Sequence, residues 1–288
     1  MPIDYERLMA LPPRLTRQTF TARDTILYAL GVGTGQDLSQ NSDELKFVYE
    51  KVLEALPTMA VILAYPGFWQ REPEYRLTWQ KIVHGEQSLA LHRPLPVAGT
   101  VRGEMTIDAI YDKGIDKGAL LCSRREIYDD ITGVHLATVR QSSFLRADGG
   151  FGGNGAKAPP PHTMPDREAD VSDLMATRPE QALIYRLSGD DNPLHADPDV
   201  AASAGFEKPI LHGLCTYAIA GRVLLKRLCG NVPARLRRMD ARFSSPVFPG
   251  ETIRVDIWDL GDGKASFRAS ATARGRTVVD NGYAEYVT

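Results

Sequence analysis

One long hydrophobic segment, GLCTYAIAGRVLLKRLC at residues 213–229, is apolar almost all round at helical spacing. Small residues along it allow close packing, and Gly230 directly after it is a typical helix end. Its cations lie toward the C-terminal end, which the helix dipole favours. A helix that is apolar on nearly every face must be covered, so we expect a sheet to wrap around it.

Partial alternation of polar and apolar positions, bounded by Gly-rich turns, predicts antiparallel strands after this helix. We expect those strands at 234–245, 251–259, 264–273 and 277–287. The N-terminal half carries the same set near 80–92, 100–111, 118–128 and 133–145. Before the long helix we expect a further strand at 182–187, then irregular chain with a short helix that Asp197 caps, Pro198 begins and Gly205 ends.

The two halves repeat each other weakly. HRPLPVAGTVRGEMTIDAIYDKG at 92–114 and RFSSPVFPGETIRVDIWDLGDGK at 242–264 share a Pro-containing strand end, a Gly turn, an alternating strand and another Gly turn. A repeat over half the chain indicates two copies of one fold. The Gly- and Pro-rich stretch 148–166 is typical of a connection, so we expect one domain at 1–147 and another at 167–288.

The helical part of the N-terminal half differs from that of the C-terminal half. TARDTILYALGVG at 21–33 is a capped helix, but LPTMAVILA is short and is interrupted by Pro57 and Pro66. The N-terminal copy is therefore expected to lack a full central helix. A missing helix leaves a cavity where the other copy has packing.

Composition narrows the function classes. The chain has 288 residues, 43% hydrophobic and 24% charged, with a net charge of −2. The chain has no surplus of basic residues that would indicate nucleic-acid binding, and no apolar run is long enough to span a membrane. We expect a cytoplasmic protein, because its three cysteines show neither disulfide nor zinc spacing. Two of them, Cys215 and Cys229, fall in the long helix as buried thiols.

The candidate chemistry lies in YRLSGDDNPLHADP at 185–198. It places Asp190, Asn192 and His195 within six positions on a turn stiffened by Pro193. A carboxylate and an imidazole held on one rigid turn can position a water for proton transfer in both directions, as reversible hydration of a double bond requires. As an isolated pair, Asp190 could instead cap a turn and His195 could be a core histidine.

SGDDNPLHADP followed by GFEKPILHGLCTYA resembles the signature of the hydratase 2 family, the MaoC-like (R)-specific enoyl-CoA hydratases. The resemblance covers nearly the whole chain, including KIVHGEQSLALHRPLP, GGFGG and ARFSSPVFPGETI, and is strongest for the two-domain form found in peroxisomal multifunctional enzymes and bacterial relatives. It implies an α+β double hot-dog fold: two long antiparallel sheets, each wrapped round a helix, with the catalytic motif in the C-terminal unit. Hot-dog units commonly pair their sheets edge to edge, and two units in one chain can satisfy that pairing.

The resemblance also implies roles for single residues. Asp190 and His195 would be catalytic and hold the water, with Asp190 favoured as acceptor of its proton, although the sequence leaves the assignment open. Asp191, Asn192, Pro193 and Leu194 would form the turn at the substrate, with Asp191 facing solvent. The N–H of Gly213, at the helix start, would polarise the thioester oxygen, and His212 beside it would be structural.

Further matches lie outside the motif. His84, Gly85, Lys113 and Phe243 match positions that contact acyl-CoA in the family. A turn lysine such as Lys113 could equally be solvated, and Phe243 could be a core residue. Glu50 matches a position where a carboxylate matters, and we expect it to support the interface between the two units.

The implied reaction is hydration of trans-2-enoyl-CoA to (R)-3-hydroxyacyl-CoA, with no metal and no cofactor apart from the coenzyme A of the substrate. Three alternatives remain: a dehydratase for a bulky or branched acyl-CoA, a hot-dog acyl-CoA thioesterase, and an acyl-CoA-binding scaffold without turnover. A thioesterase would release free thiol, and a scaffold would bind without turnover. The acyl-CoA substrate is the expected partner, and a homodimer is one assembly that the sequence leaves open.

Overall fold

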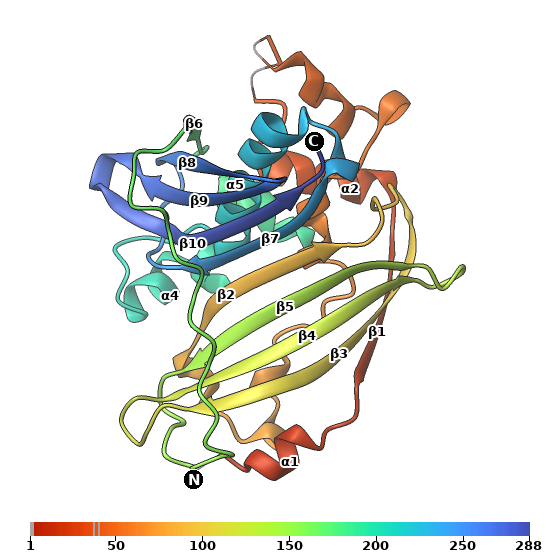
Figure 1. Cartoon of the computed structure of the whole chain (residues 1–288). Helices are drawn as coiled ribbons and strands as arrows, with labels where there is room; N and C mark the ends of the chain where they lie inside the picture. The colour runs from red at the N-terminus through yellow and green to blue at the C-terminus, as the bar shows by residue number, and fades with distance from the viewer. Residues whose placement is uncertain (1–2, 37, 40) are drawn as a thin grey trace.

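The computed structural model describes residues 3–36, 38–39 and 41–288 of the chain. Its centre is one antiparallel sheet of 10 strands in the order β1-β3-β4-β5-β2-β7-β10-β9-β8-β6 (Figure 1). The strands are β1 Arg14–Phe20, β2 Ile82–Leu91, β3 Gly99–Asp112, β4 Ala119–Asp129, β5 His135–Leu145, β6 Val171–Ala176, β7 Leu236–Phe243, β8 Thr252–Gly261, β9 Lys264–Ala271 and β10 Arg276–Tyr286.

The order shows the internal repeat directly. Read inward from the edge, the N-terminal half runs β1-β3-β4-β5-β2 and the C-terminal half runs β6-β8-β9-β10-β7. Each half therefore has the same five-strand topology. The predicted strands of both repeats are confirmed, and the expected α+β double hot-dog arrangement is the one observed.

The two half-sheets join edge to edge through β2 and β7. Five residue pairs, from Glu86 with Arg242 to Ala90 with Arg238, lie opposite each other across this junction. The guanidinium of Arg242 lies 2.7 Å from the carboxylate of Glu86, which adds an ion pair to the backbone pairing. Because each inner edge pairs with the other, the two sheets form one continuous sheet.

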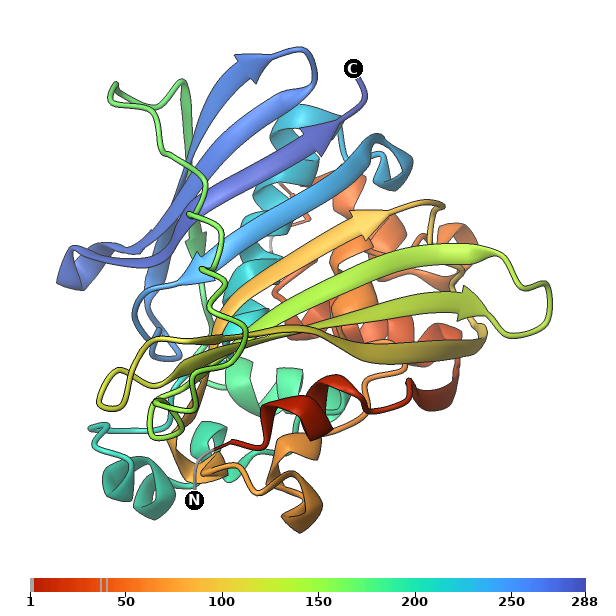
Figure 2. The ribbon, with the colours of Figure 1, turned by 60° about the horizontal axis from the view of Figure 1, so that its bottom comes forward.

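The predicted long helix is α5, Gly213–Cys229, and it ends at Gly230, whose φ of 58° is left-handed. It lies against one face of the sheet (Figures 1 and 2) and packs on β7, β8 and β10. Cys215 and Cys229 are both buried along it, as expected. The helix is thus the core of the C-terminal half.

The N-terminal half has a capped helix, α2 at Ala22–Gly31, in which Thr21 and Asp24 form a reciprocal capping box. The described part of this half has no long helix equivalent to α5. It has instead a series of short 3-10 helices: η1 Ser42–Phe47, η2 Glu50–Val52, η3 Pro57–Val61, η4 Trp69–Arg71, η5 Pro73–Tyr75 and η6 Trp79–Lys81. Proline begins η3 and η5, and such turns do not extend into a long α-helix. The predicted reduction of the N-terminal helix is confirmed.

One predicted element is wrong. Residues 182–187 are not a strand: they form helix α3, Gln181–Tyr185, followed by η7, Arg186–Ser188. A short apolar run does not by itself distinguish strand from helix. Gln181, Ala182 and Tyr185 are the buried positions, a spacing that fits one helix face. The strand of this region is β6, which begins about ten residues earlier in the chain.

The remaining helices are short: α1 Tyr5–Met9, α4 Pro198–Ser203, η8 Pro193–His195, η9 Pro233–Arg235 and η10 Thr272–Arg274. Helix α4 has Asp197 as its cap and Pro198 at its start, as predicted. None of the helices in the described part of the chain is long and apolar enough to cross a membrane.

The segment 148–166 contains no helix or strand. It runs along the outside of the sheet from the N-terminal to the C-terminal half (green in Figures 1 and 2). His162 fixes its far end, because its ring lies 2.7 Å from the Ser266 hydroxyl and its carbonyl accepts a hydrogen bond from Asn281.

Candidate active site

The segment between α3 and α5 carries the motif residues. His195 is 8% exposed and ends η8, and its Nδ1 lies 2.8 Å from the carbonyl oxygen of Ile210. A carbonyl can only accept, so Nδ1 carries the hydrogen and Nε2 of the neutral ring is left as an acceptor. Burial lowers the pKa of His195, against the opposing effects of the Ile210 bond and the charge of Asp190. The ring is therefore a base at neutral pH.

Asp190 lies beside this ring. One ligating atom each from Asp190, His195 and His212 lie within 4.8 Å of one another. Two acceptors up to about 5 Å apart can both bind one water at normal hydrogen-bond lengths. The predicted proximity of Asp190 and His195 is therefore present in the structure, although their catalytic roles remain a prediction.

The other turn residues shape the backbone. The amide oxygen of Asn192 accepts from the N–H of Leu194, and the N–H of Asn192 donates to Asp190. Asp191, Asn192 and Pro193 are exposed and Leu194 is half-buried. Asp191 thus faces solvent as expected, and Asn192 holds the turn that presents the Asp190 carboxylate.

His212 is more closely tied to this pair than the sequence suggested. Its ring stacks on that of His195, with centroids 3.7 Å apart and an interplanar angle of 26°. Its Nε2 donates to the carbonyl of Asp190 at 3.3 Å. Burial, and secondarily the charge of His195, lower the pKa of His212 to about 3. His212 therefore stays neutral and joins the His195 ring to the Asp190 backbone.

Gly213 is the first residue of α5, where no preceding turn supplies a carbonyl for its N–H. A Cβ at this position would come within 3.3 Å of the Phe243 ring. The ring of His84 meets Phe243 edge-on from the other side, with centroids 4.8 Å apart. Phe243 thus lies between the helix start and strand β2 of the other half.

The residues matched to acyl-CoA contacts lie at one end of the sheet. His84 and Gly85 are near the start of β2, where the pairing with β5 has a bulge. Lys113 follows β3, and its exposed ammonium lies 5.8 Å from the ring centroid of Phe144 at the end of β5. Burial lowers the pKa of His84 to about 4. The structure thus brings Phe243 and His84 into contact and places Lys113 several strands away.

Glu50 was expected to support the interface between the two units, but the structure shows no such contact for it among the described residues. It is exposed, and no hydrogen bond or ion pair joins it to another described residue. A buried carboxylate that links the halves is Glu44, which is 5% exposed and binds Arg222 of α5 through both oxygens at 2.8 and 2.9 Å. The sequence indicated a carboxylate in the right segment, but six positions away from the buried one.

Two groups in the described residues have the side chains to ligate a metal. In the first, Asp190 and the two histidines, one nitrogen of each ring already faces a carbonyl. The second is His92, Glu126 and His135, where Thr138 donates to Glu126 and lies 2.9 Å from His92. Hydrogen bonds account for both arrangements.

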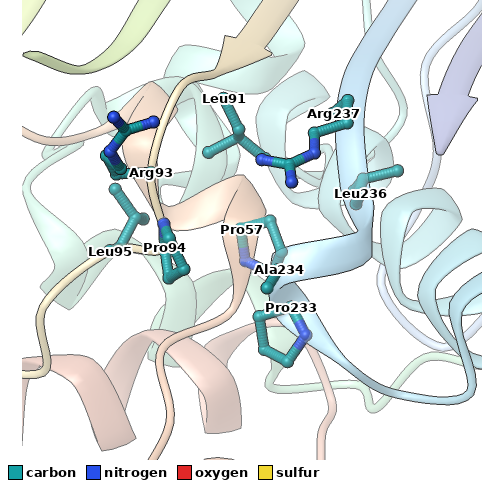
Figure 3. Close-up of a pocket in the computed structure, with 9 residues that line it drawn as sticks. All are labelled: Pro57, Leu91, Arg93, Pro94, Leu95, Pro233, Ala234, Leu236 and Arg237. Carbon is teal, nitrogen blue, oxygen red and sulfur yellow. The ribbon is translucent and has the colours of Figure 1, made fainter. Parts of the chain in front are cut away.

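A small crevice lies at the other end of β2 and β7 (Figure 3). Leu91 and Leu236, the outer ends of the two strands, line it together with Pro57 and Pro233. Strands of this length put it about 20 Å from His84 and Phe243. The crevice is therefore separate from the site at Asp190.

Two family models match the chain, one in each half. Residues 18–147 match the family described as MFE-2 hydratase 2 N-terminal domain, and residues 161–281 match the MaoC like domain. The 3-hydroxyacyl-thioester dehydratase Y of Mycobacterium tuberculosis is 43% identical, over 93% of each chain. The chain belongs to the MaoC-like hydratase 2 family.

Two further relatives support this membership. The peroxisomal enoyl-CoA hydratase 2 of Arabidopsis thaliana is 35% identical, over 92% of this chain and 89% of the relative. The crystal structure of a MaoC-like dehydratase from Phytophthora capsici superposes with a TM-score of 0.87 at 37% identity, covering 99% of both chains. The hydratase 2 fold therefore extends over both halves of the chain.

Proposed function

We propose that this chain adds water reversibly to trans-2-enoyl-CoA thioesters to give (R)-3-hydroxyacyl-CoA, as a hydro-lyase. The observation that carries the proposal is the placement of the Asp190 carboxylate and the neutral His195 ring side by side, close to the start of α5. The names of the relatives, a 3-hydroxyacyl-thioester dehydratase and an enoyl-CoA hydratase 2, agree with this reaction.

The two acceptors orient the nucleophile. One water donates its two hydrogens to Asp190 and to Nε2 of His195, which leaves an oxygen lone pair directed at Cβ of the enoyl group. Bond formation at Cβ moves electrons onto the thioester oxygen, where the Gly213 N–H and the α5 dipole stabilise the enolate. The proton taken from water is then returned to Cα, so the site ends the reaction in its starting state.

In this proposal the two halves have different roles. The C-terminal unit, 167–288, carries the water and the oxyanion contact, and the N-terminal unit, 1–147, accommodates the acyl group. Phe243 and His84 border the channel at the junction, and Lys113 offers its ammonium to a coenzyme A phosphate. The coenzyme A of the substrate is the only cofactor moiety in this reaction.

Replacing the two acceptors tests the assignment. Asp190→Asn and His195→Gln keep shape and lose proton acceptance, so each is expected to lower hydration of crotonyl-CoA by at least ~10²-fold. Loss of the enoyl-thioester absorbance measures the rate, and chiral analysis of the product checks the (R) outcome. Asp199→Asn, an exposed carboxylate of the same segment, should leave the rate unchanged. Full activity in either acceptor variant would refute the mechanism, and thiol release would indicate a thioesterase instead.

A further inference from the structure

Arg125 of β4 is a buried cation that pairs with no carboxylate among the described residues. It is 5% exposed, and its one hydrogen bond to a described residue goes to the carbonyl of Val61 at 2.7 Å. Its Nε has no partner in the described part of the chain. Burial lowers its pKa to about 10, which still leaves it charged at neutral pH. An unpaired buried charge is strongly unfavourable and therefore needs a reason.

The other strongly buried arginine of the same fold shows the contrast. Arg222 is 7% exposed, and its Nε likewise has no partner among the described residues, but its other nitrogens bind both oxygens of Glu44 and the carbonyl of Val32. A structural arginine in this protein thus has a counter-charge supplied by the chain. Arg125 lacks one among the described residues.

The backbone around Arg125 packs closely against its side chain. Met105 of β3 and Val139 of β5 lie opposite Arg125, so all three face the same side of the sheet. On that side a Cβ on Gly103 would lie 3.1 Å from Cδ of Arg125 and 2.8 Å from the carbonyl of Ala64. Only a glycine allows the segment after η3 to pack so closely over the arginine.

One side chain, that of Tyr65, connects Arg125 with the candidate active site. The guanidinium lies 5.5 Å from the ring centroid of Tyr65, which is 37% exposed. The pKa of Tyr65 is raised by burial and next by the negative charge of Asp190, and Arg125 opposes that rise. Tyr65 is therefore within electrostatic range of both the Arg125 cation and the Asp190 carboxylate.

An apolar hollow lies next to a neighbour of the arginine in the sheet. Met105, the partner of Arg125 in the strand register, lines this hollow together with Trp69, Tyr75 and Ile107. The rest of the wall is Leu11, Pro12, Pro13 and Arg14. A hydrocarbon chain fits a mainly apolar wall, and a buried guanidinium recognises a carboxylate.

We propose that Arg125 binds a carboxylate at the distal end of the acyl chain, so that the preferred substrates are enoyl-CoA thioesters of dicarboxylic acids. This inference rests on the proposed hydration. The thioester end is held at Gly213 and the far end at Arg125, and Tyr65 separates that second carboxylate from Asp190. The part of the acyl chain between these two ends is hydrocarbon.

The test compares two enoyl-CoA thioesters of equal length, one ending in a carboxylate and one in a methyl group, over a series of lengths. The wild-type kcat/KM should favour the carboxylate by about 10- to 100-fold at the best length. Arg125→Met should abolish that preference, so that the two thioesters are hydrated with equal kcat/KM. Arg140→Met, an exposed arginine on the neighbouring strand, is the control and should keep the preference.

Stability gives a second readout. Removing an unpaired buried charge is expected to raise the melting temperature of Arg125→Met, whereas loss of a structural arginine would lower it. A wild type that hydrates both thioesters equally overturns this inference and leaves the hydratase proposal standing. A wild type that hydrates neither refutes the hydratase proposal itself. If Arg125→Met does not fold, the wild-type ratio still decides.

Discussion

The proton-accepting nitrogen of His195 depends on one backbone carbonyl, that of Ile210. The sequence could predict that Asp190 and His195 meet, because a proline turn of six residues cannot separate them far. It could not show the tautomer of His195, which depends on where Ile210 falls in space. Nor could it show the His212 stack, because that contact depends on how the chain returns at the start of α5.

We predict that His212 positions the pair through its hydrogen bond to the Asp190 carbonyl. His212→Phe keeps a ring to stack on His195 but cannot donate, so Asp190 is held less firmly. We expect kcat for crotonyl-CoA to fall about 10-fold with a smaller change in KM. His212→Gln retains a donor and should recover part of the loss. Equal activity of wild type and His212→Phe would show that the bond is dispensable.

The four strands repeated in each half and the helix α5 were predictable because their patterns are strong. Alternation located the strands to within a few residues, and Gly230 located the end of α5. The 3-10 helices of the N-terminal half obey no long period, β1 and β6 gave no clear signal, and the short apolar run of α3 was predicted as a strand. Glu50 and Glu44 illustrate the limit: both lie in short 3-10 turns, where one residue of phase decides which carboxylate faces α5.

The contact between α5 and η3 should be sensitive to a single methyl group. A Cβ on Gly221 would lie 2.5 Å from Cγ2 of Thr58 and 3.2 Å from the sulfur of Met239. Although alanine favours helices, we expect Gly221→Ala to lower the free energy of unfolding by about 1–3 kcal/mol. Thr58→Ser removes that Cγ2, so the double variant should recover stability in urea unfolding. Additive losses in the double variant would contradict the clash.

The Arg222–Glu44 ion pair should link the stability of the two halves. Glu44→Gln leaves the buried guanidinium without its counter-charge, and we expect a loss of about 3–5 kcal/mol. Replacing both partners, as Glu44→Leu with Arg222→Met, should be much less harmful because no charge is then left buried. Urea titration followed by fluorescence measures both. A single variant as stable as the wild type would show that the pair contributes little.

At the scale of the whole molecule, buried neutral histidines should make stability depend on mildly acidic pH. Burial lowers the pKa of His84 to about 4 and that of His212 to about 3, against about 6.5 in an unfolded chain. Below pH 6.5 the unfolded state therefore binds protons that the native state does not, so stability is full above that pH and falls as pH decreases.

Each such histidine contributes a slope of up to about 1.4 kcal/mol per pH unit between its two pKa values. We expect the free energy of unfolding to fall measurably between pH 6 and 5, above the range where carboxylates with lowered pKa titrate. His212→Phe removes one of these groups, so its unfolding free energy should depend less steeply on pH. A wild-type stability that is flat over this interval would refute the expectation.

The junction of β2 with β7 depends on main-chain hydrogen bonds, which tolerate most side-chain changes. The 3-10 segments of the N-terminal half lie outside the sheet, whereas the turn that carries Asp190 and His195 belongs to the other copy. Under the proposed function, mutations in the 3-10 segments can therefore change which acyl chains bind while the residues of the catalytic turn stay the same. A duplication that left one copy free to diverge in this way would let a lineage acquire new substrates while keeping a single ancestral reaction.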